Sequence, residues 1–167
     1  MIKYKLDPDI LRRLRHIVET LDLQHVEMSR IYAVKSFGSG ARGTLARCHA
    51  LGKIFQKAMD IRAIYIIEVI SEKFDKLSKE DQDEVLIHEL MHIPKSFGGG
   101  FVHHNVVNDK NVKALHKHYK KLVEENSSGN KYEHLERYLE KSGSSDELVN
   151  DNFIEDQDKN IKKRRWF

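Results

Sequence analysis

The sequence predicts an α+β fold, in which strands come early in the chain and most helices come late. Runs rich in β-branched residues lie at 30–37 (RIYAVKSF) and 63–70 (AIYIIEVI), and such runs are typical of strands. Apolar residues recur at helical spacing over 8–22 and again over 78–93, which indicates amphipathic helices. Because strands and helices are segregated rather than alternating, we expect a small sheet of about three strands packed against helices.

The N-terminal half begins with a predicted helix at about 8–22. Asp7 is suited to the N-cap and Pro8 to the first helical position. The glycine-rich segment GSGARG (38–43) lacks the Gly-Lys-Ser/Thr ending of a phosphate-binding loop, so we interpret it as a flexible loop between strands. Strands are expected at 30–37, 44–52 and 63–70. A short helical or irregular link is expected at 53–59.

The C-terminal half is predicted to be helical. Ser78, followed three residues later by Asp81, resembles a capping box, and the helix that it opens must stop near Ile93 because Pro94 disfavours helical geometry in the preceding residue. Three glycines at 98–100 then allow the chain to reverse. Further helices are expected at 109–125, 131–141 and 146–164, which gives one domain over 1–145 and a charged helix or tail over 146–167.

Composition excludes several classes of protein. The chain has 167 residues, a formal net charge of +3 and a single cysteine, which rules out an internal disulfide framework and cysteine-rich zinc ribbons. No apolar run approaches the roughly 18–20 residues that a membrane-spanning helix needs, so we expect no membrane insertion. The first ten residues, MIKYKLDPDI, lack the apolar core of a signal peptide. A soluble, cytoplasmic protein is therefore expected.

Charge is distributed unevenly along the chain. Residues 1–70 carry 12 Lys/Arg against 7 Asp/Glu, whereas residues 124–158 carry 3 against 11, and the last nine residues, KNIKKRRWF, hold five basic residues. Basic segments of this kind attract nucleic acid or other anionic surfaces. Nucleic acid contacted through the basic N-terminal half and the tail is therefore a candidate partner. The sequence does not predict an oligomeric state.

The residues His88-Glu89-Leu90-Met91-His92 form an H-E-x-x-H motif on a predicted helix. Residues four apart project from one helix face, so both imidazoles can reach a single ion. Zinc accepts imidazole nitrogens, and Glu89 is then expected within reach of a metal-bound water, whose proton it can accept. We therefore predict that His88 and His92 are metal ligands and that Glu89 is the general base.

A third ligand is expected after the glycine loop, at His103 or His104. No glutamate occurs between His92 and Glu124, and the long metzincin motif is absent because Lys95 and Gly98 stand at its key positions. Adjacent side chains point in different directions, so one of the two histidines should be a ligand and the other a bystander. The remaining six histidines are expected to have no metal role: His116 and His118 as solvent-facing side chains, and His16, His25, His49 and His134 as structural residues.

The segment YIIEVISEKFDKLSKEDQDEVLIHELMHIPKSFGGGFVHH (65–104) resembles the metallopeptidases of archaea and phages, which are similar to SprT-like minimal zincins. The resemblance covers roughly residues 30–140. It implies a zincin-like fold with the HExxH helix packed on a small curved sheet, Zn²⁺ as cofactor, and Glu89 as the catalytic base. It places the ligands at His88, His92 and the loop histidine, and favours His104, which precedes Asn105, over His103.

These observations lead to one leading hypothesis and two alternatives. The leading hypothesis is a zinc-dependent metallopeptidase, a hydrolase that cleaves protein or peptide substrates by Glu-assisted attack of a metal-bound water, with the strand at 63–70 as an edge for an extended substrate. The first alternative is a nucleic-acid-associated SprT-like protease or zinc-binding protein that acts on DNA-bound proteins. The second is a catalytically silent zinc-binding module.

Overall fold

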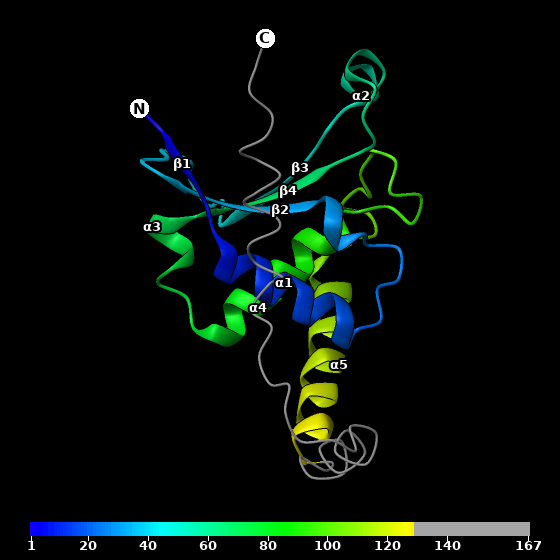
Figure 1. Cartoon of the computed structure of the whole chain (residues 1–167). Helices are drawn as coiled ribbons and strands as arrows, with labels where there is room; N and C mark the ends of the chain where they lie inside the picture. Colours follow the sequence, from blue (N-terminus) through cyan, green and yellow to red (C-terminus); the bar gives the residue numbers. More distant parts are fainter. Residues whose placement is uncertain (129–167) are drawn as a thin grey trace, which may run out of the picture. The chain divides into compact units, whose positions relative to one another are not determined.

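The structure is a computed structural model that describes residues 1–128, and over this range the chain folds as a mixture of helices and one sheet, as the sequence predicts (Figure 1). The predicted helices at 131–141 and 146–164, and the predicted boundary after residue 145, lie outside the described residues. A short 3-10 helix, Met28–Arg30, precedes β2. The other elements, in chain order, are β1 (Lys3–Leu6), α1 (Pro8–Thr20), β2 (Ile31–Phe37), β3 (Ala46–Ala50), α2 (Lys53–Met59), β4 (Tyr65–Ile70), α3 (Ser71–Phe74), α4 (Lys79–Met91) and α5 (Asp109–Ser128).

The sheet has four strands in the order β1-β2-β4-β3. β2 and β4 pair in parallel, while β1 pairs antiparallel with β2 and β3 pairs antiparallel with β4. The sequence predicts only three of these strands. It misses β1 because its four residues, KYKL, are all exposed, so the strand shows no alternation of apolar and polar side chains. β3 forms one edge of the sheet, and β4 is internal.

The core lies between one face of the sheet and the helices α1 and α4. Figure 1 shows α1, α4 and α5 on the same side of the sheet. Alternate residues of β4 face these helices, and Tyr65, Ile67 and Val69 are completely buried. Leu14 and Ile17 of α1 are equally buried. The buried residues therefore recur every second position on the strand and about every 3.6 positions on the helix, and they pack together in a single apolar layer.

α1 begins as the sequence predicts and ends two residues early. The side chain of Asp7 accepts hydrogen bonds from the backbone N–H groups of Asp9 and Ile10, each at 3.0 Å, and Pro8 occupies the first helical position. The helix ends at Thr20 rather than at residue 22 because Asp22 adopts a left-handed conformation with φ 49°. Residues in that region cannot continue a right-handed helix.

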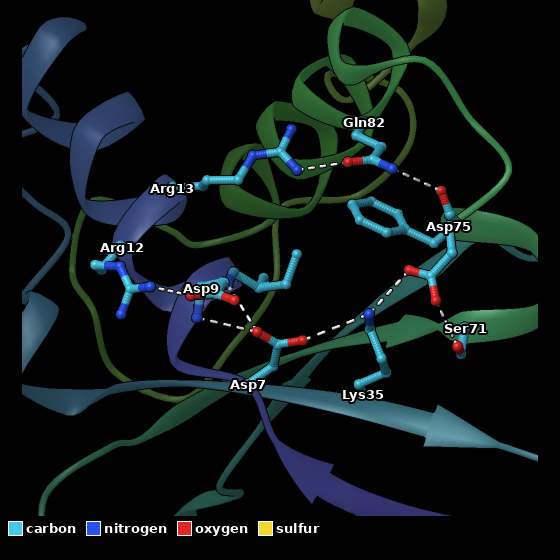
Figure 2. Close-up of polar contacts among 10 residues, drawn as sticks. Asp7, Asp9, Arg12, Arg13, Lys35, Ser71, Asp75 and Gln82 are labelled. Atoms are coloured by element: carbon cyan, nitrogen blue, oxygen red, sulfur yellow. Dashed lines mark hydrogen bonds and ion pairs between the residues drawn. The ribbon is translucent and has the colours of Figure 1, made fainter.

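α4 is held at its N-terminus by caps and by α1. The hydroxyl of Ser78 accepts a hydrogen bond from the Asp81 N–H at 3.1 Å, as the sequence predicts. The Arg13 guanidinium donates to the side chain of Gln82 and to the backbone carbonyl of Lys79, and Gln82 donates to the carbonyl of Phe74 (Figure 2). These contacts hold α4 against α1, and α4 carries most of the candidate site.

A second group of polar contacts joins α1, the sheet and α3. The Lys35 ammonium of β2 lies 3.6 Å from the Asp7 carboxylate and 2.9 Å from that of Asp75, which in turn accepts a hydrogen bond from the Ser71 hydroxyl (Figure 2). These charges surround one lysine on the helix-bearing side of the sheet. Within residues 1–128, no helix is both long and apolar enough to cross a membrane.

Candidate metal centre

The last turn of α4 brings two imidazoles together. His88 and Glu89 lie in the helix, and His92 follows its last residue as the C-cap. The Nε2 atoms of His88 and His92 are 3.2 Å apart. Two nitrogens that bind one tetrahedral zinc ion at about 2.0–2.1 Å are separated by about 3.3 Å. The spacing of the pair therefore fits a shared ion.

The loop after α4 adds a third imidazole, from His104. One ligand atom each of His88, His92 and His104 lies within 4.8 Å of the others, and the ring centroid of His104 is 4.8 Å from that of His92 and 5.8 Å from that of His88. His103 is exposed and lines the same cleft, but within the described chain it is not part of this cluster. Its carbonyl instead accepts the N–H groups of Val106 and Val107.

Backbone carbonyls fix the orientation of two of the three rings. His92 Nδ1 lies 2.7 Å from the carbonyl oxygen of Val102, and His104 Nδ1 lies 3.3 Å from that of Val107. Because a carbonyl oxygen can only accept, each Nδ1 must carry the proton, and Nε2 of the neutral ring is left with a free lone pair. Metal-binding histidines are usually held in this way.

The third ring, His88, is suited to the neutral state. Its burial lowers its pKa, and the neighbouring His92 and His104 lower it further, while Asp109 acts in the opposite direction. The neutral imidazole is the form that binds a metal ion. The donor set consists of three imidazoles whose nitrogens converge on one point, which fits zinc in both ligand type and number.

Glu89 lies beside this cluster and is buried, with 7% of its surface exposed. Burial raises its pKa to about 7, although a hydrogen bond from the backbone of Cys48 and the charge of Arg47 both oppose the rise. A carboxyl group with a pKa near neutrality can both accept and release a proton at physiological pH. Glu89 is therefore chemically suited to proton transfer.

The cluster opens into a cleft of about 730 Å³. One wall is β3 and the segment before it, and the other is formed by α4, the loop after it and the start of α5. The residues that line it include Gly43, Thr44, Leu45, Ala46, Arg47, Cys48, His49, Glu84, His88, Glu89, His92, Phe101, His103, His104 and Asp109. The sequence does not predict the contribution of β3, because that strand reaches α4 only through the strand order of the sheet.

Of the other histidines, His134 lies outside the described residues, and the two on α5 differ in outcome. His118 is exposed, as predicted, but His116 is only 5% exposed and its Nδ1 lies 3.1 Å from the Glu84 carboxylate. The prediction that His116 faces solvent is therefore wrong. The lysines around it suggest an exposed face, yet His116 follows the buried Val112 by four residues, so it lies on the face of α5 that packs on α4.

An α+β domain in which three imidazoles and a buried carboxylate share one cleft fits the class of metal-dependent hydrolases. Residues 2–127 match the family model described as "Putative phage metallopeptidase". The match covers most of the chain, which therefore belongs to this metallopeptidase family. Searches of curated proteins and of solved structures found no match.

Proposed function

We propose that the protein is a zinc-dependent metallopeptidase with a zincin-like site. His88, His92 and His104 would hold the ion, and Glu89 would act as the general base. The observation that carries the proposal is the convergence of the three imidazoles, with ligand atoms within 4.8 Å of one another, beside a carboxyl group whose pKa burial raises to about 7. Membership of a metallopeptidase family supports the same reaction class.

Glu89 performs the proton transfers in this mechanism. A bound zinc ion would supply Lewis acidity, which lowers the pKa of a coordinated water to about 7. Glu89 accepts the proton of the attacking water and then delivers it to the amine that leaves as the peptide bond breaks. The Cys48 N–H keeps the carboxylate oriented toward β3. A buried, proton-exchanging carboxylate of this kind has no purpose in a silent zinc-binding module, so we favour the enzyme over that alternative.

The substrate would lie along β3. The strand at 63–70, which the sequence favours as the edge, is internal as β4 and pairs on both sides, so that expectation is wrong. The Leu45 carbonyl accepts from Ile70 and the Leu51 N–H donates to Ile64, each at 2.9 Å. Since backbone groups alternate along an antiparallel strand, the even-numbered residues between them direct their backbone groups to the open edge. The N–H of Cys48 contacts Glu89 there, so a substrate would pair through the groups of Ala46 and Ala50. An extended peptide could pair there.

Three measurements test the proposal. Metal analysis of the purified protein should find zinc, chelation should abolish cleavage of casein or another unfolded substrate, and zinc should restore it. Glu89→Gln should abolish cleavage while the protein still binds zinc, whereas Glu19→Gln, on an exposed site of α1, should leave the rate unchanged. A Glu89→Gln variant that keeps its activity would overturn the mechanism.

Nucleic-acid binding, the basis of the SprT-like alternative, stays a prediction. In the N-terminal half, Arg13, Arg30, Lys35 and Arg47 form ion pairs with carboxylates, which reduces the charge available to a polyanion. The observation that favours binding lies elsewhere, because Lys110, Lys113 and Lys117 are exposed on successive turns of α5. Mobility shifts with DNA at several salt concentrations test it, since phosphate contacts give a steep dependence on salt.

A further inference from the structure

The glycine loop between α4 and α5 must return His104 to the imidazoles of α4. This loop follows His92, the C-cap of α4, and Gly98, Gly99 and Gly100 contribute no side chains to pack against the domain. Three successive glycines have no side chains with which to fix this part of the loop. Its position therefore depends on contacts made by neighbouring residues and by the rest of the domain.

Tyr65, at the start of β4, supplies the central contact. Its side chain is completely buried, and its hydroxyl accepts a hydrogen bond from the Gly99 N–H and donates one to the Gly100 carbonyl, each at 2.9 Å. A single hydroxyl thus satisfies a backbone donor and a backbone acceptor of adjacent residues. A phenylalanine ring would fill the same space, but it would leave both backbone groups without this partner.

Two further contacts hold the loop on either side of the hydroxyl. Phe97, which has a left-handed φ of 45°, is buried with its ring centroid 4.8 Å from that of Tyr65. The amide of Gln56, on α2, donates to the carbonyls of Gly98 and Leu51. The loop is therefore fixed at three successive points, by one apolar side chain, one hydroxyl and one amide.

The loop fixed in this way leads directly to the metal ligands. Val102 donates its N–H to the His92 carbonyl at 2.8 Å and accepts from His92 Nδ1 at 2.7 Å. Val102 therefore holds the orientation of one imidazole, and His104 follows two residues later. Gly100, which Tyr65 holds, is two residues before Val102. A displacement of Gly99 and Gly100 would therefore change the positions of both the His92 and the His104 imidazoles.

We propose that Tyr65 is a positioning residue of the metal centre, which fixes the glycine loop so that Val102 orients His92 and His104 reaches the ion. This inference rests on the proposed zinc site. Tyr65 would then have two roles, because its ring packs in the apolar core and its hydroxyl positions the loop. The hydroxyl, and not the ring, carries the effect, so the substitution that isolates it is Tyr65→Phe.

The first test is the affinity for zinc, measured by competition with a chromogenic chelator. Tyr65→Phe should weaken zinc binding by about tenfold or more, the range seen when groups that orient metal ligands are removed, and excess zinc should restore cleavage. Tyr119→Phe is the matched control, because Tyr119 is a buried residue whose hydroxyl contacts His16 at 3.0 Å, away from the loop. It should leave the zinc affinity unchanged. Equal affinities of wild type and Tyr65→Phe would overturn the inference.

The second test uses the metal-free protein, so that failure of the zinc site and failure of this inference can be told apart. Amide hydrogen exchange at Gly99 and Val102 should accelerate in Tyr65→Phe and not in Tyr119→Phe. Unchanged exchange would overturn the role of Tyr65 even if the wild type binds zinc, whereas a wild type that binds no zinc would overturn the proposed function. Should Tyr65→Phe fail to fold, Gln56→Ala, on the half-buried side of α2, should give the same acceleration at Gly99.

Discussion

Glu89 of α4 receives a hydrogen bond from the backbone of Cys48 on β3, so the candidate base is tied to the edge strand that forms the opposite wall of the cleft. The contact comes from a backbone N–H, and it is therefore insensitive to the side chain at position 48. The same strand would align the substrate. Base and substrate would thus share one reference, the backbone of β3, which keeps their relative position fixed.

Substitution of the two loop histidines separates the ligand from its neighbour. His104→Ala should lower zinc affinity by at least about tenfold and abolish activity, since two imidazoles remain of a site that needs three protein ligands. His103→Ala should retain bound zinc, because His103 is not part of the cluster among the described residues. Zinc content after gel filtration measures both. Loss of zinc from His103→Ala with retention in His104→Ala would reverse the assignment.

Cys48 should be unreactive at neutral pH. Burial, together with the nearby charge of Glu89, raises the pKa of its thiol to about 12. Because the thiolate is the nucleophile, alkylation by iodoacetamide at pH 8 should be slower, by at least about tenfold, than that of a free cysteine in a model peptide. Mass spectrometry follows the reaction, and denaturant should abolish the protection. Rapid alkylation of the folded protein would contradict the raised pKa of this thiol.

Acid should destabilise the protein partly through Glu68. Its burial raises the pKa of this carboxyl, but the facing Ser36, His49 and Arg47 outweigh that effect and hold the pKa below its usual value. A folded pKa below the unfolded one, about 4.3, gives stability that is present above the unfolded pKa and is lost as the pH falls through the folded pKa. The free energy of unfolding should therefore decrease below about pH 4.3.

Glu68→Gln isolates this contribution. The variant should lose roughly 1–3 kcal/mol at pH 7, as expected when hydrogen bonds to a buried charged group are removed, and its stability should depend less on pH in the acid range. Urea unfolding at pH 7 and pH 4 measures both effects. Glu19→Gln, at an exposed site, is the control and should match the wild type. If the free energy of unfolding of Glu68→Gln decreased with falling pH as steeply as that of the wild type, Glu68 would not be the cause of the acid sensitivity.

Gly99→Ala should disturb the loop that carries His104. Gly99 has φ +84°, and a Cβ there would lie 2.2 Å from the Gln56 amide nitrogen and 2.5 Å from the Leu51 carbonyl oxygen. Backbone strain and overlap should together cost about 1–3 kcal/mol and weaken zinc binding. Gly40→Ala is the matched control, because nothing lies within 4 Å of its Cβ position. Thermal unfolding and zinc titration of both variants distinguish the two sites.

Local sequence patterns predict α4 and its three motif residues, because cap, helical period and the spacing of His88 and His92 are all properties of neighbouring residues. Features that depend on residues far apart in the chain are harder to predict. The burial of His116 depends on α4 packing against α5, and the open edge of β3 depends on the strand order. The contacts of Tyr65 depend on a loop about 35 residues away, which no local pattern indicates.

The open edge of β3 has a consequence for the behaviour of the protein in solution. A strand with unpaired backbone groups can pair with another copy of the same chain as readily as with a substrate. β3 is only five residues long, and Arg47 and His49 place polar side chains on it. Short length and charge both discourage aggregation through a sheet edge. The features that discourage pairing between copies of β3 would therefore also limit a peptide to a short paired segment.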